Sequence, residues 1–163
     1  MKTILIFFLL GLTLSYDREA VAKCIDDYNE VQNELKKKEE NSNEKTPNLD
    51  RDKDSAKIIG HCMYSAGKAD FNGCNQNRDE HGNFLSSSAL RDCLISKGWK
   101  KSKPLRGNPV FMINTLNNEV DKTMIVGRDE TRKQFFYVNC CCIQSNECRD
   151  IPKSNLEFYT KIE

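Results

Sequence analysis

The sequence lacks the recurrent motifs of several common enzyme classes. It contains no GxSxG nucleophile elbow, no HExxH motif, no EF-hand loop and no glycine-rich phosphate-binding loop. Its only two histidines are His61 and His81, and nothing in the sequence supplies a positioned nucleophile for either. Acidic pairs such as Asp79 and Glu80 are sequence neighbours, whereas glycoside hydrolysis needs carboxylates that face each other across a cleft. We therefore expect no catalytic residues and a protein that is not an enzyme.

The chain also has little net charge and no standard metal-ligand spacing. It carries 25 basic and 24 acidic residues, a formal net charge of +1, so a nucleic acid or an anionic membrane surface is not an expected partner. Local charged patches remain compatible with this balance. Cys74 has no CxxC partner, and the two histidines form no zinc spacing. The sequence therefore predicts no metal and no cofactor.

Long hydrophobic runs are absent except at the start of the chain. After Lys2, residues 4–14 (ILIFFLLGLTL) are apolar, and Thr13 and Ser15 are small residues placed for cleavage after Ser15. As a helix this run would span only about 16 Å, against roughly 30 Å of bilayer hydrocarbon. We therefore expect a signal peptide over 1–15, no stable membrane insertion, and one secreted, extracellular domain over 16–163.

Cysteine is abundant by contrast, and the count is even. The eight cysteines are Cys24, Cys62, Cys74, Cys93, Cys140, Cys141, Cys142 and Cys148. In an oxidising compartment this count favours four disulfides, although eight cysteines allow 105 connectivities. If a strand runs through the three consecutive cysteines, the first and third share a face and the second points the other way. We expect the former pair to bridge to Cys24, Cys62 or Cys93, and Cys141 to reach Cys74 or Cys148.

Three helices are predicted in the N-terminal half. The first, within 17–38, has apolar or small residues at helical spacing, at Val21, Cys24, Tyr28, Val31 and Leu35. We interpret this stripe as core packing rather than as a zipper. A second helix, capped by Asp54 or Ser55, ends at Gly67, and a third follows the serines at 86–88 and ends at Gly98, with Trp99 in the core.

Strands are predicted from residue 110 onward. The segments 110–116, 122–127 and 133–143 are rich in β-branched and aromatic residues and are separated by turn sequences, and 156–162 is a possible fourth strand. The fold class is therefore α+β, with N-terminal helices packed on a C-terminal antiparallel sheet of three to four strands, cross-linked by disulfides.

Two polar segments separate these elements. Residues 36–54 mix charges of both signs with one large apolar residue, Leu49, and we interpret them as a flexible loop or linker. The segment 72–83 is almost wholly polar and is tethered at Cys74. Its central residues are the candidate binding loop, namely Asn75, Gln76, Asn77, Arg78, Asp79, Glu80 and His81.

The segment HCMYSAGKADFNG, residues 61–73, resembles the region after the third cysteine of insect odorant-binding proteins. The resemblance implies an all-helical carrier of a small apolar ligand. The family also has two cysteines separated by three residues, and here position 58 is Ile. Because the C-terminal third is rich in strand-forming residues, this function is an alternative.

The sequence predicts a disulfide-stabilised domain and an exposed polar loop, and it contains no recognisable group of catalytic residues. This combination favours binding over catalysis. We expect a monomeric, toxin-like effector of the venom, salivary or host-interaction type that binds an extracellular protein target. The alternatives are the apolar-ligand carrier and a structural secreted protein without catalytic activity.

Overall fold

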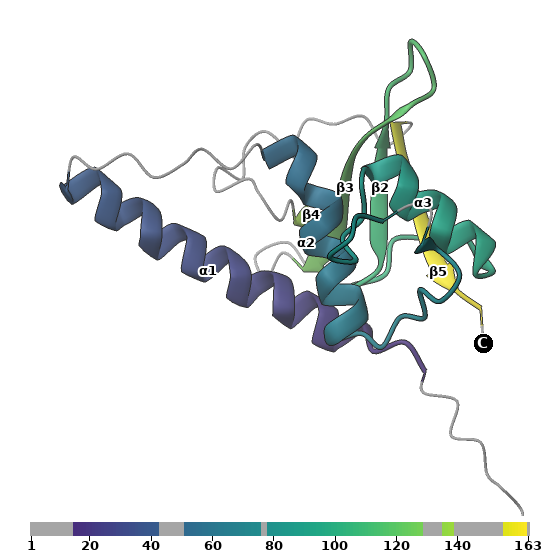
Figure 1. The fold of residues 1–163 in the computed structure, drawn as a ribbon, viewed down its shortest axis with the longest axis horizontal. Helices are drawn as coiled ribbons and strands as arrows, with labels where there is room; N and C mark the ends of the chain where they lie inside the picture. The colour runs from purple at the N-terminus through teal and green to yellow at the C-terminus, as the bar shows by residue number, and fades with distance from the viewer. Residues whose placement is uncertain (1–14, 43–50, 76–77, 129–134, 139–154, 163) are drawn as a thin grey trace, which may run out of the picture.

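The computed structural model describes residues 15–42, 51–75, 78–128, 135–138 and 155–162, and its helices precede its strands (Figure 1). The predicted signal peptide lies almost entirely outside the described residues, as do Cys140, Cys141, Cys142 and Cys148. The elements are α1 (Arg18–Ser42), α2 (Arg51–Ser65), α3 (Ser87–Ser96), β1 (Trp99–Lys101), β2 (Pro109–Ile113), β3 (Val120–Arg128), β4 (Phe135–Val138) and β5 (Leu156–Lys161). The predicted α+β class is confirmed.

The sheet is antiparallel and has the order β1-β5-β2-β3-β4. The predicted meander is present as β2, β3 and β4, and the possible fourth strand is β5, which pairs with β2. In this register Val110 lies opposite both Met124 of β3 and Phe158 of β5. The three-residue strand β1 pairs with β5 and was not predicted, because a segment this short is too short to show the alternation of apolar and polar residues that indicates a strand. Trp99, its first residue, is buried as expected.

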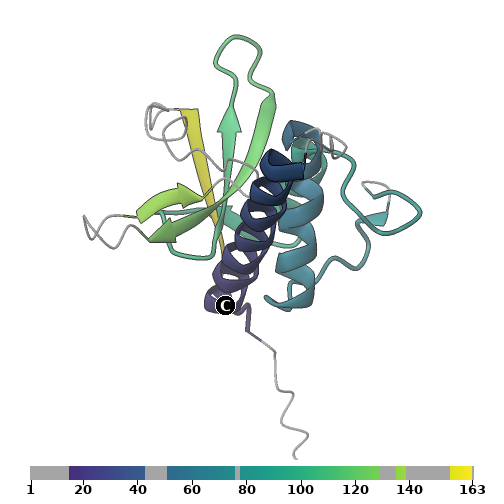
Figure 2. The ribbon, with the colours of Figure 1, turned by 90° about the vertical axis from the view of Figure 1, so that its left-hand side faces the viewer.

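Helices α1 and α2 lie on one side of the sheet (Figure 2). Strand residues of one parity, among them Phe111, Ile125 and Tyr159, join the core formed with the helices. Residues of the other parity, including Val110 and Met124, form a second buried cluster. Because side chains alternate along a strand, apolar residues at consecutive positions make both faces of the sheet apolar.

Among the α1 residues whose burial the structure describes, the buried ones lie in the N-terminal part of the helix. Val21, Ala22 and Ile25 are buried, whereas Val31, which we expected on the buried stripe, is 54% exposed. Figure 1 shows the reason: the C-terminal part of α1 extends beyond the sheet and the other helices. The interpretation of the stripe as core packing therefore holds for its first turns and is wrong at Val31.

The predicted linker over 36–54 is partly helical. Helix α1 continues through residue 42 and α2 begins at residue 51, while 43–50 lie outside the described residues. Lys and Glu, which dominate the end of α1, have high helix propensity, so a charged segment that buries little can still extend a helix already nucleated by packing.

Ser55 is an interior residue of α2 and not its cap. It is fully buried, and its Oγ lies 3.5 Å from the Oγ of Ser87 and accepts a hydrogen bond from the N–H of Thr123 at 3.4 Å. The prediction for α3 is confirmed, since Ser86 is its N-cap and accepts a hydrogen bond from Ala89 N at 3.0 Å.

The described disulfides join Cys24 to Cys62 and Cys74 to Cys93. The expected bridges from these cysteines to the C-terminal group are therefore wrong. The first disulfide links α1 to α2, which run side by side, and the second links the loop after α2 to α3. Sequence periodicity indicated correctly that Cys62 and Cys93 face the core, but their partners depend on how the helices pack.

Candidate functional site

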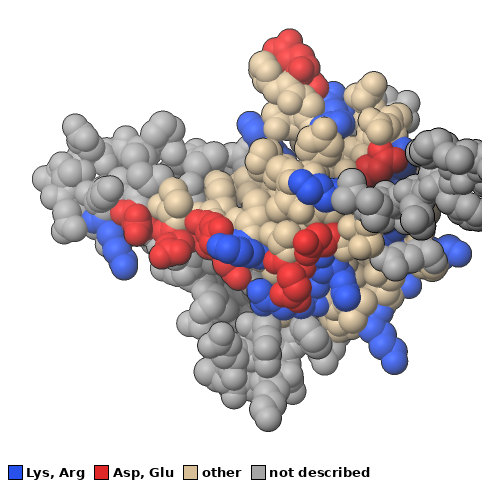
Figure 3. All heavy atoms as spheres, turned by 90° about the horizontal axis from the view of Figure 1, so that it is seen from below, with Lys and Arg blue, Asp and Glu red and all other residues tan. Residues whose placement is uncertain are grey.

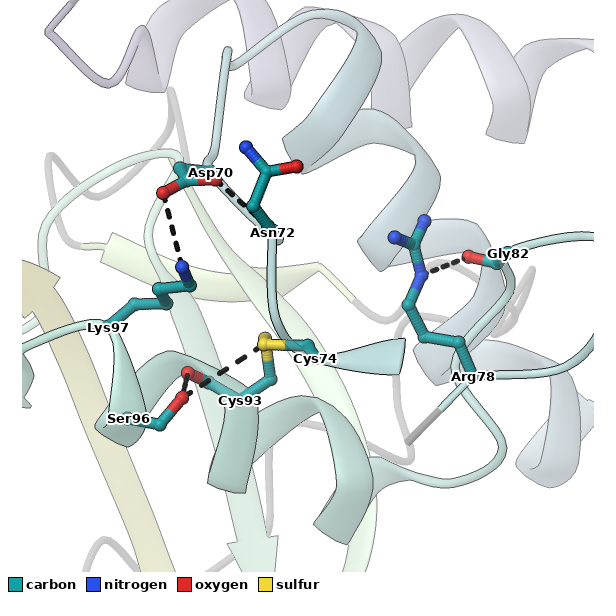
Figure 4. The surroundings of a disulfide bond; sticks show 8 residues. All are labelled: Asp70, Asn72, Cys74, Arg78, Gly82, Cys93, Ser96 and Lys97. Atoms are coloured by element: carbon teal, nitrogen blue, oxygen red, sulfur yellow. Dashed lines mark hydrogen bonds and ion pairs between the residues drawn. A yellow bond between two sulfur atoms is a disulfide. The ribbon is translucent and has the colours of Figure 1, made fainter. Parts of the chain in front are cut away.

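The candidate binding loop belongs to a longer segment, residues 70–84, which we call the Cys74 loop. It connects α2 to α3 and is fixed to α3 by the disulfide between Cys74 and Cys93, whose Cα atoms are 5.6 Å apart (Figure 4). Both cysteines are buried, and Ser96 Oγ donates a hydrogen bond to Cys93 O at 2.7 Å beside them. The loop is therefore held at one end by a covalent bond in the core.

A charged contact supports the start of the loop. Asp70 accepts a hydrogen bond from Asn72 N at 2.9 Å and forms an ion pair with Lys97 at 3.2 Å (Figure 4). The N–H of Asn72, and then Lys97, hold the pKa of Asp70 below its ordinary value. This carboxylate therefore stays ionised at neutral pH, and the contact weakens only on acidification toward and below about pH 4.

Arg78 crosses the middle of the loop above two aromatic rings. Its guanidinium carbon lies 5.8 Å from the ring centroid of Phe71 and 5.5 Å from that of Phe84. The two rings are edge to face at 4.9 Å, and Arg78 Nε donates to Gly82 O (Figure 4). Phe84 packs against Gly60 of α2, where a Cβ would lie 2.6 Å from the ring. Arg78 thus fastens the loop to the core as well as forming part of its surface.

Asp79 organises the turn that follows. Its carboxylate accepts hydrogen bonds from His81 N at 2.9 Å, from Asn83 N at 2.8 Å and from Asn83 Nδ2 at 3.1 Å. These bonds, with those from Asn83 the most important, hold the pKa of Asp79 below its ordinary value. Gly82 has a φ of +79°, a conformation that glycine adopts without a steric penalty.

The tip of the loop is exposed to solvent. The side chains of Glu80 and His81 are 86% and 76% exposed, and Glu80 Oε1 lies 3.5 Å from His81 Nε2. Asn75 is also exposed, whereas Gln76 and Asn77 lie outside the described residues. The structure therefore separates these candidate residues into a half-buried pair, Arg78 and Asp79, whose side chains contact the rest of the loop, and an exposed pair, Glu80 and His81.

Sequence reasoning missed the residues that support the loop. Phe71, Phe84, Asp70 and Lys97 were not predicted to take part. The Asp70–Lys97 pair spans 27 positions, so no local spacing could have indicated it. The aromatic residues at both ends of the polar segment were the available signal, because apolar residues that flank a loop commonly anchor it.

The described residues contain no group of three or more His, Cys, Asp or Glu side chains that could hold a metal ion. No helix in the described part of the chain is long and apolar enough to cross a membrane. His61 is exposed on α2.

Comparisons of the chain with protein-family models, with curated proteins and with solved structures found no match.

Proposed function

We propose that this protein is a secreted, disulfide-stabilised effector that binds an extracellular protein target through the exposed tip of the Cys74 loop. The observation that carries the proposal is the contrast between an internally fixed loop and its exposed charged tip. A loop that is already ordered loses less conformational entropy on binding than a mobile one. Secretion is supported by the apolar N-terminal segment and by the disulfides, which persist in oxidising compartments.

The internal contacts of the loop favour a role in presentation. The hydrogen bonds that Asp79 accepts and the position of Arg78 over the rings fix the backbone of the turn, from which Glu80 and His81 face solvent. Side chains presented from a fixed backbone can be complementary to a specific partner, whereas a catalytic role would require a further reactive group beside them.

A binding experiment with a matched control tests the proposal. Mature protein, the double variant Glu80→Ala/His81→Ala, and the control His61→Ala/Glu119→Ala are immobilised and exposed to target-tissue extract. The control removes the same residue types from exposed positions elsewhere. We expect a saturable protein partner whose affinity falls at least about tenfold for the loop variant and is unchanged for the control.

Two outcomes would contradict the proposal. Full binding by the loop variant would remove the tip from the interface. Saturable uptake of a fluorescent apolar probe, with no protein partner captured, would favour the alternative of an apolar-ligand carrier.

A further inference from the structure

A cluster of lysines surrounds the edge strand β1. The segment 97–106 (KGWKKSKPLR) contains five basic residues and no acidic residue. The register adds a residue from the other end of the chain, because Trp99 of β1 lies opposite Lys161 of β5. We call this set of side chains the β1 lysine edge, and its members are Lys97, Lys100, Lys101, Lys103 and Lys161. Arg106 is not part of it, because it pairs with Glu19 and Asp26 of α1.

Strand geometry spreads these charges over both sides of the edge. Lys100 and Lys101 are consecutive in β1 and exposed, so their side chains point to opposite faces. Lys103 is exposed just beyond the strand. β1 is the outermost strand of the described sheet, with β5 as its neighbour. An extended partner lying along this edge would meet ammonium groups on both sides.

Three of the five lysines form no ion pair among the described residues, although Lys161 is close enough to Asp70 to contribute to the lowered pKa of that carboxyl. Lys97 is paired with Asp70, and Lys101 is paired with Glu157, which also lies 3.6 Å from Arg91. No ion pair within the described part of the chain involves the other three, Lys100, Lys103 and Lys161. The edge therefore keeps an excess of positive charge despite the near-neutral chain.

Compensating acidic residues lie elsewhere on the molecule. Exposed acids line α1, Glu119 lies in the turn between β2 and β3, and the exposed Asp121 is the second residue of β3. Figure 3 shows acidic side chains gathered along α1, whereas basic side chains predominate at the right-hand end of the same face. Separation of charge of this kind gives a protein of low net charge a local positive potential.

We propose that the β1 lysine edge binds a sulfated polysaccharide of the extracellular space. Clusters of Lys and Arg of this density are a recognised type of site for heparin-like and other polyanions. Lysine supplies a compact point charge that suits sulfate groups along a flexible chain. The proposal depends on secretion but not on the protein target proposed for the Cys74 loop.

Two other polyanions are less compatible with this surface. Single-stranded nucleic acid is bound by stacking on exposed aromatic residues, and Trp99, the aromatic residue within the cluster, is 3% exposed. An anionic membrane is bound by basic residues combined with inserted apolar area. Among the described residues, the exposed large apolar side chains close in sequence to this edge are two, Ile95 and Ile162, which offer little area for insertion.

The test measures binding of the mature protein to heparin, to fully desulfated heparin, to single-stranded DNA and to vesicles containing phosphatidylserine, at physiological salt and again at higher salt. The variant Lys100→Gln/Lys103→Gln/Lys161→Gln removes the three unpaired lysines and leaves Lys97 and Lys101 in their ion pairs. The control is Lys23→Gln/Lys57→Gln/Lys68→Gln, which changes the net charge equally at exposed positions outside the β1 lysine edge; of these, Lys23 is ion-paired with Asp27. Circular dichroism checks that each protein is folded.

We expect heparin binding that weakens with added salt and disappears with the desulfated polymer. The triple variant should lose roughly a hundredfold in affinity, by analogy with lysines at anionic lipid surfaces, and the control should lose little. Equal loss in the control would mean that net charge alone is responsible. The absence of heparin binding, or equal or tighter binding to DNA or vesicles, would also overturn the proposal.

Discussion

Gly107 shows how a single residue joins distant parts of this chain. Its φ is +79°, and a Cβ at this position would lie 1.9 Å from the carbonyl oxygen of Arg18. Its own carbonyl accepts a hydrogen bond from the Tyr16 hydroxyl at 2.9 Å, which helps to explain why Tyr16 is held against the core. Burial raises the pKa of Tyr16 well above its ordinary value, so the donor proton is retained at any physiological pH. The sequence gives no sign of this contact, because its two sides are 91 positions apart.

Substitution of Gly107 separates steric contact from backbone conformation. Gly73 has a similar φ of +82° but nothing within 4 Å of the Cβ position, so it is a matched control. Gly73→Ala should cost about 1–2 kcal/mol of unfolding free energy, the usual penalty for the left-handed region. Gly107→Ala should cost about 3 kcal/mol or more, because the backbone of Arg18 must also move. Urea unfolding followed by circular dichroism measures both, and equal losses would show that the contact with Arg18 carries no energy.

At the scale of the elements, the sequence predicted a helix or a strand correctly where all the local signals in a segment agreed on one type of structure. The segments around β2 and β3 are apolar and β-branched, and α3 has a capping serine, apolar positions at helical spacing and Gly98 just after it. The limits of α1 and α2 were wrong because Lys- and Glu-rich sequence has both helix propensity and the composition of a linker. The location of the Cys74 loop was predicted, but its supporting contacts were not, since they join loop residues to distant positions such as Gly60 of α2 and Lys97 at the end of α3.

The two described disulfides allow a test of how the Cys74 loop is held. Removal of Cys74–Cys93 by the double alanine variant should cost about 3 kcal/mol, and removal of Cys24–Cys62, which spans 38 positions, about 4 kcal/mol in the chain-entropy model. Hydrogen exchange at the amides of residues 78–84 should increase in the first variant and stay unchanged in the second under conditions where both remain folded. Equal exchange in both would mean that Arg78 and Asp79 order the loop without the disulfide.

At the scale of the whole molecule, disulfides stabilise the helical half, and noncovalent contacts join that half to the sheet. Every cysteine before residue 94 is paired with another cysteine before residue 94, so the helical half is cross-linked within itself. The sheet is joined to that half by packing and hydrogen bonding. Examples are the ring of Tyr16, just before α1, against Trp99 of β1 at 4.8 Å, and the hydrogen bond from Thr123 of β3 to Ser55 of α2. Sheet pairing also connects β2 with the distant β5. The sequence indicated both layers but assigned their connection to disulfides, because cysteine count carries no information about which packed surfaces bring two thiols together.

Cleavage of the turn between β2 and β3 tests directly whether the two halves of the chain are joined by noncovalent contacts alone. Residues 115–118 are exposed, and a specific protease site placed there would divide the chain after both described disulfides. Without reductant, the two fragments should remain associated in native buffer, because β2 pairs with both β3 and β5. In concentrated denaturant, still without reductant, they should separate on size-exclusion chromatography.

Alkylation of the separated C-terminal fragment, which contains Cys140, Cys141, Cys142 and Cys148, should then add no mass if all eight cysteines are paired as the even count predicts. Fragments that stay joined until reductant is added would instead show a covalent link between the halves and would contradict the pairing of Cys24 with Cys62 or of Cys74 with Cys93.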